Sequence, residues 1–166
     1  MIILHIKGVN EISQEIYDKA IKILDLSLLT CPSCKHTGTT VHAYYDRRVR
    51  DDKESFRLIV LRVKCSFCEK THALLPDLIV PYSSISLKNI IQVILSRSPE
   101  ERKEIFDRTT IDWSDIHRIR RAYKQVWKER LISFGICIDE DLSRNCIRQF
   151  KSQFMQIRYT PCGSYG

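Results

Sequence analysis

The sequence lacks the features that would direct a chain into or across a membrane. None of its apolar runs approaches the length of a membrane span. Its first apolar run, residues 2–6, is also too short for the hydrophobic region of a signal peptide. We therefore expect a soluble, cytoplasmic protein that has no membrane partner.

Catalytic signatures are missing as well. Glycine is scarce, with five residues in a chain of 166, and no phosphate-binding loop is present. The sequence shows no candidate nucleophile and no pair of acids expected to converge from separated elements. These absences predict that the protein is not an enzyme and has no small-molecule substrate.

Four cysteines in two C-x-x-C pairs are the most informative residues that the chain does contain. The pairs are Cys31 with Cys34 and Cys65 with Cys68. Each pair can give two thiolates to one tetrahedral ion, and a hairpin between the pairs would bring them together. The spacing therefore predicts one structural Zn²⁺. Four thiolates leave no open coordination position, so we expect the ion to organise the fold and to perform no chemistry.

Disulfides and a redox pair are the two other roles open to these cysteines. Disulfides need an oxidising compartment, and the N-terminus does not predict secretion. A redox C-x-x-C begins a helix in a βαβ unit, whereas both pairs here flank strand-like sequence. Nearby histidines could replace a cysteine, but with four thiolates available we expect surface or hydrogen-bonded roles for them. These histidines are His36, His42 and His72.

Residues 1–30 predict a strand and a packing helix. The strand covers residues 2–6, and the helix covers residues 11–26 with Asn10 as its N-cap. Apolar residues recur at helical spacing in this segment and should pack on the part of the chain that follows. They are Ile12, Ile16, Ala20, Ile23 and Leu24.

Residues 31–76 predict a four-cysteine zinc ribbon built on a long β-hairpin. Residues 40–50 and 55–64 are rich in β-branched and aromatic side chains and are separated by a charged tip. Three acids in this region are close in sequence, so we expect a solvated turn and not a two-metal nuclease site. These acids are Asp46, Asp51 and Asp52.

Basic residues lie along both predicted strands of the hairpin. They either face solvent, as charged residues on a strand usually do, or lie along the phosphates of a nucleic acid. They are Arg47, Arg48, Arg50, Arg57, Arg62 and Lys64.

Residues 77–135 predict a linker and three helices. The linker, residues 76–84, contains prolines that interrupt strand pairing, but it is apolar and should pack. The first helix begins at Ser86 and has an apolar stripe. The stripe consists of Leu87, Ile90, Ile91, Ile94 and Leu95.

The second and third helices have the order of a helix-turn-helix. A capping box at Ser98 begins a short helix that ends near Arg108. A longer, basic helix starts near Asp112 and continues to about Ser133, where Gly135 is placed to end it. In a helix-turn-helix, the last helix enters the major groove of DNA.

A helical wheel divides the third helix into an apolar face and a polar, basic face. Arg120 lies near the apolar edge, and we expect its charged end to reach solvent. The apolar face carries Ile116, Ile119, Tyr123, Val126 and Trp127. We predict that the polar face and its flank read bases and neutralise phosphates, the alternative being an ordinary solvated surface. The predicted DNA contacts are Ser114, His117, Arg118, Arg121, Lys124, Gln125 and Lys128.

Five short motifs also carry a resemblance to a known family. They are Cys31-Pro32-Ser33-Cys34 and residues 42–45, 61–68, 71–76 and 81–83. They resemble an uncharacterised bacterial family whose members look like transposase-type zinc-ribbon and helix-turn-helix proteins. The resemblance implies zinc and DNA binding. The segment after Gly135 is too short for a ribonuclease-H-like catalytic core, so we expect no strand-transfer chemistry.

Residues 136–166 predict one short packing helix and a loose tail. The helix would present Ile147, Phe150, Phe154 and Ile157. The remaining cysteines are irregularly spaced, and we expect free thiols and not a second metal site. They are Cys137, Cys146 and Cys162.

The sequence thus predicts an α+β fold with a zinc ribbon followed by a helix-turn-helix, and a protein that binds double-stranded DNA. Bound to DNA, it would be associated with the bacterial nucleoid. Two alternatives remain open. The first is a zinc-ribbon adaptor for another protein, and the second is an accessory subunit of a transposase. The adaptor would use an exposed aromatic surface made of Trp113, Tyr123 and Trp127.

Overall fold

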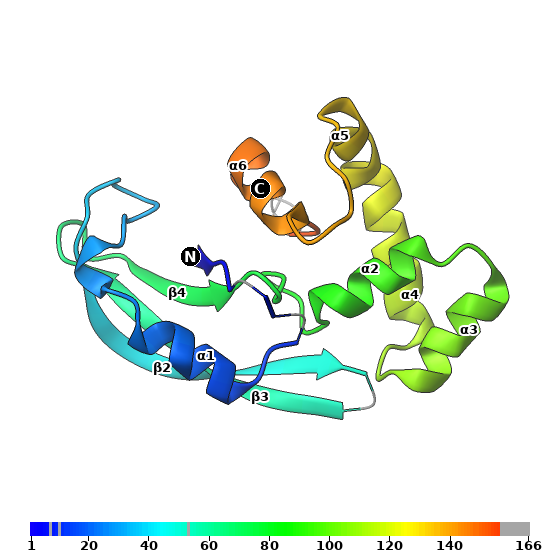
Figure 1. The fold of residues 1–166 in the computed structure, drawn as a ribbon, viewed down its shortest axis with the longest axis horizontal. Helices are drawn as coiled ribbons and strands as arrows, with labels where there is room; N and C mark the ends of the chain where they lie inside the picture. The colour runs from blue at the N-terminus through cyan, green and yellow to red at the C-terminus, as the bar shows by residue number, and fades with distance from the viewer. Residues whose placement is uncertain (7, 10, 53, 157–166) are drawn as a thin grey trace, which may run out of the picture.

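The computed structural model describes residues 1–6, 8–9, 11–52 and 54–156. It has the mixed α+β fold that the sequence predicted, with a four-stranded sheet beside a group of helices (Figure 1). The strands are β1 (Ile2–Leu4), β2 (Thr39–Asp51), β3 (Glu54–Cys65) and β4 (Thr71–Pro76). The α-helices are α1 (Gln14–Lys22), α2 (Leu87–Leu95), α3 (Pro99–Arg108), α4 (Trp113–Ala122), α5 (Lys128–Ser133) and α6 (Leu142–Phe150).

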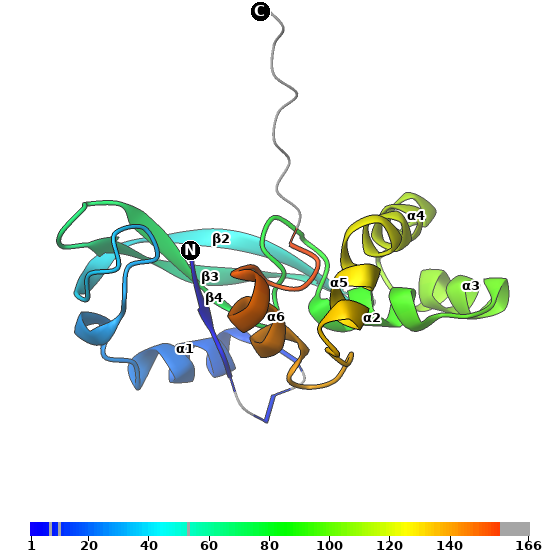
Figure 2. The same ribbon diagram turned by 90° about the horizontal axis from the view of Figure 1, so that it is seen from above.

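The sheet is built around the predicted hairpin. Its strand order is β1-β4-β3-β2, with β1 parallel to β4 and the other pairs antiparallel. The register of β2 and β3 runs from Thr39 opposite Cys65, which we call the hairpin base, to Asp51 opposite Glu54, the hairpin tip. Figure 2 shows α1 along the sheet, whereas α2 to α5 gather at the end where the tip lies. The hairpin therefore connects the cysteine turns to the helices.

The first helix is shorter than predicted. α1 begins after Ser13, whose hydroxyl accepts a backbone N–H bond, and it ends at Lys22. The predicted cap, Asn10, lies outside the described residues. Because the helix stops before Ile23, this side chain leaves the apolar stripe and is 88% exposed.

Tyr17 is a core residue that the predicted stripe of α1 did not include. Its ring is buried, and its hydroxyl donates to the Leu74 carbonyl and accepts from the Leu61 N–H, both at 3.0 Å. Burial raises the pKa of Tyr17 to about 12, so the hydroxyl keeps its proton at neutral pH. It therefore bridges β3 and β4 as a permanent donor and acceptor.

The linker and the next two helices follow the prediction closely. Ile79 and Val80 of the linker are buried, so this segment packs as expected. Ser86 and Ser98 cap α2 and α3, each accepting the N–H of the residue three positions later. Leu95 departs from the predicted stripe and is exposed, because α2 ends at this residue.

The third predicted helix runs continuously through α4 and α5 but contains a π-helical turn, Tyr123–Trp127. A π turn is wider than an α turn and shifts the side chains that follow it. Val126, predicted on the apolar face, is therefore 37% exposed, whereas Trp127 is fully buried. Gly135 follows the end of the helix with φ of +60°, as predicted for a terminating residue.

The helical core centres on Trp127. The rings of Phe150 and Phe154 approach it edge-on, with centroids 5.9 and 5.3 Å from its own. The C-terminal helix, α6, packs on Trp127 through Phe150, but it ends at this residue, so Phe154, which was predicted on the helix, packs from the segment that follows it. Cys137 and Cys146 are free thiols, whereas Ile157, Cys162 and the predicted tail lie outside the described residues.

The described ranges contain no helix with the length and hydropathy of a membrane span.

Candidate metal centre and exposed basic helix

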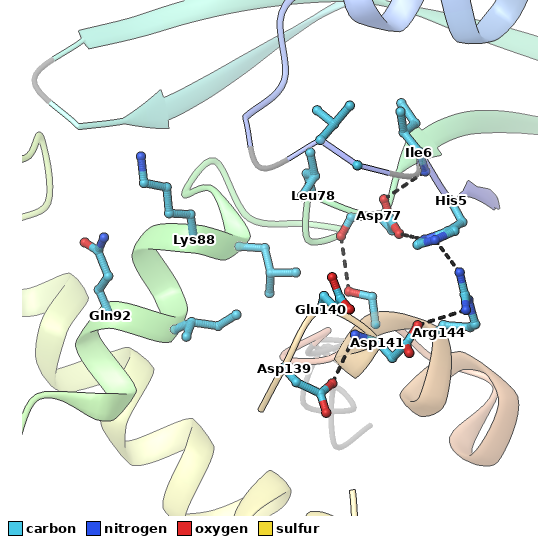
Figure 3. Close-up of a pocket in the computed structure, with 15 residues that line it drawn as sticks. His5, Ile6, Asp77, Leu78, Lys88, Gln92, Asp139, Glu140, Asp141 and Arg144 are labelled. Atoms are coloured by element: carbon cyan, nitrogen blue, oxygen red, sulfur yellow. Dashed lines mark hydrogen bonds and ion pairs between the residues drawn. The ribbon is translucent and has the colours of Figure 1, made fainter. Parts of the chain in front are cut away.

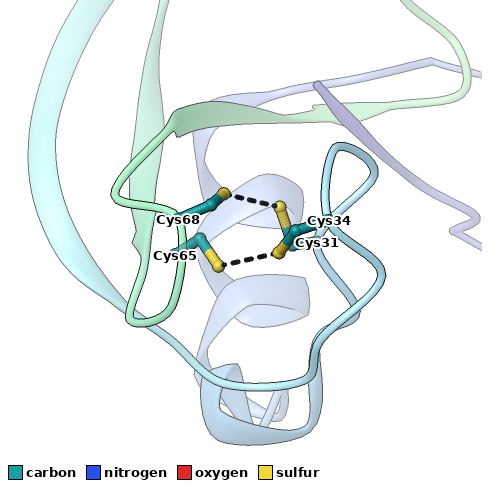
Figure 4. Close-up of side chains that lie close together, drawn as sticks. All are labelled: Cys31, Cys34, Cys65 and Cys68. Atoms are coloured by element: carbon teal, nitrogen blue, oxygen red, sulfur yellow. Dashed lines mark hydrogen bonds between the residues drawn. The ribbon is translucent and has the colours of Figure 1, made fainter.

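The four predicted ligands meet at the hairpin base (Figure 4). The Sγ atoms of Cys31 and Cys68 are 3.7 Å apart, and those of Cys34 and Cys65 are 3.6 Å apart. All four sulfurs lie within 4.8 Å of one another. A tetrahedral ion with metal–sulfur bonds of about 2.3 Å would separate its ligand atoms by about 3.8 Å. The cluster is therefore a possible metal-binding site with the spacing that one tetrathiolate ion needs.

The two cysteine turns share one backbone pattern. The N–H of Lys35 donates to the Cys31 carbonyl, and the N–H of Glu69 donates to the Cys65 carbonyl. Lys35 and Glu69 both have left-handed backbone conformations, with φ of 67° and 59°. Each turn closes the chain tightly enough to place its two sulfurs at one site, so the local backbone builds the ligand geometry.

Hydrogen bonds at the sulfurs favour thiolates at two of the four positions. Burial raises the pKa of the Cys31 thiol, but bonds with the Cys34 backbone and neighbouring groups outweigh this effect and lower it to about 5. A bond with the Cys68 backbone likewise lowers the pKa of Cys65. At Cys34 a bond with the His36 backbone lowers the pKa, but burial and the other thiols raise it further, to about 12. Thiolates crowded this closely repel one another, which suits a bound cation.

None of the three nearby histidines belongs to the cluster of potential ligands, as the sequence predicted. His72 is buried, with Nε2 3.2 Å from the Cys31 sulfur, so it can donate to that thiolate and fix its orientation. His36 stacks on Phe67 at a centroid distance of 3.7 Å and thereby connects the two cysteine turns. His42 is exposed on β2.

The hairpin tip holds the start of α4 through contacts that the sequence did not reveal. Arg50 Nη2 donates to Asp115 Oδ2 at 2.6 Å, and the two side chains are only 18% and 7% exposed. Arg50 Nη1 also donates to the Thr110 carbonyl, and the Thr110 N–H donates to the Asp52 carbonyl at 2.7 Å. The second carboxylate oxygen of Asp115 accepts from Arg118 at 2.5 Å. These bonds tie the first turn of α4 to β2.

Two interpretations of the hairpin need correction. Arg50 and Arg47 are not available to phosphates, because Arg50 binds Asp115 and Arg47 donates to two linker carbonyls. The acidic turn is also not simply solvated: Asp51 accepts from the hydroxyl that caps α2, and Asp52 pairs with Lys88. The hairpin arginines that stay exposed are Arg48, Arg57 and Arg62.

All seven side chains predicted to contact DNA are exposed, and we call them the basic face. Ser114 donates to Asp112, and Arg118 pairs with Asp115. Within the described ranges, no hydrogen bond or ion pair engages the side chains of the other five members. These are His117, Arg121, Lys124, Gln125 and Lys128.

The prediction that the charged end of Arg120 reaches solvent is wrong. Its Nη1 donates to the carbonyls of Val93 and Ser96, at 3.2 and 2.9 Å. These carbonyls lie at the C-terminal end of α2, where backbone acceptors have no partner within the helix. Arg120 therefore joins α4 to α2.

The aromatic surface predicted for an adaptor does not form as a unit. Trp113 is exposed and stacks on Phe106 of α3 at a centroid distance of 5.4 Å. Tyr123 is only half-exposed, and Trp127 is fully buried because it is the centre of the helical core. The exposed aromatic surface that α3 and α4 form is thus the pair Phe106 and Trp113.

A cavity of about 580 Å³ lies between the N-terminal segment, α2 and the segment that leads into α6 (Figure 3). In its wall, His5 donates from Nδ1 to the Asp77 carboxylate and accepts at Nε2 from Arg144. Arg144 also pairs with Asp141 at 2.8 Å. These polar groups hold the N-terminal segment against α6. Their positions are far apart in sequence, so no local motif could have indicated the cavity.

Comparison with known proteins identifies a family. Residues 31–120 match the model described as a domain of unknown function, DUF6431, which covers more than half of the chain. The protein belongs to the DUF6431 family. The DUF6431 region begins at the first ligand cysteine and extends into α4, so it contains the cysteine cluster and the Arg50–Asp115 contact. No curated protein and no solved structure matched the chain.

Proposed function

We propose that this DUF6431 protein binds double-stranded DNA, and that one structural Zn²⁺ at the four cysteines orders the hairpin that holds the DNA-binding helices. The basic face is the observation that carries the proposal, because five of its seven side chains have no hydrogen bond or ion pair within the described residues. Helix α3, a connection of residues 109–112 and helix α4 follow one another as in a helix-turn-helix. Helix α4 would enter the major groove by its N-terminal half.

The side chains of α4, of the π-helical turn and of α5 have the chemistry that base reading and phosphate binding require. Arginine can bridge the two major-groove acceptors of guanine, and glutamine can pair with adenine, which suits Arg121 and Gln125. Lys124 and Lys128 would neutralise phosphates and set the position of the helix. Asp115 would orient the guanidinium of Arg118 before DNA arrives.

Zinc is the metal that best suits the cysteine cluster. Four thiolates at tetrahedral spacing are a common structural zinc site, and four protein ligands leave no position for a substrate. We therefore assign the ion a folding role and the protein no catalytic role. Arg50 and Asp115 would then hold α4 on the metal-ordered hairpin.

Duplex binding can be tested with two charge-matched double variants. Arg121→Gln with Lys124→Gln removes two unpaired cations from the basic face, whereas Lys19→Gln with Lys22→Gln removes two exposed cations from α1. We expect the first variant to lose affinity for duplex DNA in fluorescence anisotropy and to show a salt dependence reduced by about one contact per lost phosphate interaction. The α1 variant should keep near-normal affinity. Equal losses in both variants would mean that only net charge matters and would reject α4 as the interface.

A protein adaptor, or an accessory subunit that acts with a transposase, is the second candidate. The exposed Phe106–Trp113 pair favours it, since contiguous aromatic residues are enriched at protein interfaces. Metal-loaded protein that has no affinity for duplex DNA at low salt would select this candidate. In that case Trp113→Ala should weaken binding to the protein partner.

A further inference from the structure

A strained, exposed tyrosine lies beside the basic face. The Ser83 N–H donates to the Val80 carbonyl at 3.1 Å, closing a turn with Pro81 and Tyr82 at its centre. Tyr82 has φ of +64°, as the third position of a type II turn requires. Glycine is favoured at that position because a Cβ atom opposes the left-handed conformation. The chain nevertheless places a tyrosine there, with 69% of its surface exposed.

Contacts from β2 keep the turn in this conformation. Arg47 Nη2 donates to the carbonyls of Val80 and Ser83, both at 2.9 Å. The backbone N–H of Arg50 donates to the Ser84 carbonyl at 2.6 Å. Strained backbone persists where the surroundings over-determine it, and such positions cluster at functional sites. The exposed ring of Tyr82 is therefore a candidate for binding and not for packing.

Tyr82 lines a cavity of about 140 Å³ together with Arg118 of α4. Ile90, Ile119, Ala122 and Met155 line it as well, together with other residues of the turn segment. The cavity is well below the roughly 300–1,000 Å³ of sites that hold drug-sized ligands, so its size suits a single ring system. Arg118 Nη2 donates to Asp115 Oδ1 at 2.5 Å. This bond leaves the other N–H groups of the guanidinium in a defined orientation.

We propose that this cavity receives one unpaired nucleobase of the DNA held by α4, an inference that rests on the proposed function. The ring of Tyr82 would stack on the base, an interaction that tolerates any base because each has a π face. Arg118 would stack on the same base or donate to its ring acceptors. A nucleobase suits the cavity better than an apolar ligand, because the basic face next to it would attract the attached phosphates.

The test compares two duplexes of the same sequence, one fully paired and one with a single unpaired nucleotide. Affinities of the zinc-loaded protein are measured by fluorescence anisotropy. Tyr82→Gly removes the ring and relieves the backbone strain, so this variant should melt at the same temperature as the wild type or higher. Tyr82→Phe keeps the ring. Tyr44→Ala, which removes an exposed tyrosine from β2, is the matched control.

We expect wild-type protein, Tyr82→Phe and Tyr44→Ala to bind the duplex with the unpaired base more tightly, by about fivefold or more. Tyr82→Gly should bind both duplexes equally and keep the wild-type affinity for the paired one. Equal binding of both duplexes by wild-type protein would overturn the nucleobase site and leave the proposed function intact. Absence of binding to either duplex would reject the proposed function, and the nucleobase site with it.

Discussion

The two ends of the β2–β3 hairpin are held by different chemistry. At the base, four cysteine sulfurs converge within 4.8 Å, and each pair comes from one tight turn. At the tip, Arg50 bonds to Asp115 and to the Thr110 carbonyl, and these partners lie 60 or more residues along the chain. The base is thus built from one kind of local turn that occurs twice, whereas the contacts at the tip depend on the whole fold. We expect the two ends to fail in different ways.

Metal removal should have the largest effect. Binding of structural zinc contributes about 10–16 kcal/mol to the folding of small zinc modules, so a chelator or Cys65→Ser should unfold the hairpin base. Circular dichroism should then show loss of strand signal, and thermal melting should shift to much lower temperature. Cys137→Ser, which changes an exposed thiol outside the cluster, is the control. Unchanged melting after verified metal removal would contradict a structural metal.

Breaking the tip should have the next largest effect. Arg50→Ala leaves the buried Asp115 carboxylate with one exposed partner, Arg118, and should lower the free energy of unfolding by about 3 kcal/mol. Urea unfolding measures this change. Arg48→Ala removes an exposed arginine two residues away and should change stability by less than about 0.5 kcal/mol. Similar losses in the two variants would show that the buried pair adds nothing.

Glycine substitutions should strengthen the base. Lys35 and Glu69 have left-handed backbones that cost a residue with a Cβ atom about 1 kcal/mol. Lys35→Gly and Glu69→Gly should therefore each raise the free energy of unfolding by about 0.5–1 kcal/mol, measured on the metal-loaded protein. Ser66 lies in the same turn as Glu69 but has no positive φ, so Ser66→Gly should instead be neutral or destabilising.

The smallest effect concerns acid. Asp112 caps α4 next to the tip, and hydrogen bonds from the Ser114 hydroxyl and the Asp115 N–H hold the pKa of Asp112 below its usual value. A depressed pKa means that this stabilisation is complete above the unfolded-state pKa and is lost as pH falls through the folded-state pKa. Stability of the wild type should therefore decline faster in acid than that of Asp112→Asn, which can still cap the helix. Identical pH profiles from unfolding titrations would contradict this role.

The difference between base and tip also explains what the sequence could predict. The ligand cysteines were recognisable because tetrahedral coordination imposes a short, repeated spacing. The limits of α3 and of the long helix were recognisable because Ser98, Asp112 and Gly135 act locally. The division into four segments and the helix-turn-helix remain predictions.

Features that depend on distant partners were not predictable. Arg50 and Arg47 resemble the exposed arginines beside them in sequence. Only the folded chain shows that Arg47 donates to the linker and Arg50 to α4. The π-helical turn likewise has no signature in residues 123–127, yet it moves Val126 to the surface. The strain at Tyr82 depends on bonds from β2 to the linker.

The most direct test of the account is the affinity of the metal-loaded protein for duplex DNA across a salt series, before and after chelation, with metal content measured in the same sample. We predict one zinc per chain and an affinity that falls with salt by about 0.9 log units per phosphate contacted for each tenfold increase. Binding should disappear when the metal is removed. No binding at low salt with zinc present, or unchanged binding after zinc removal, would contradict a zinc-dependent DNA-binding protein.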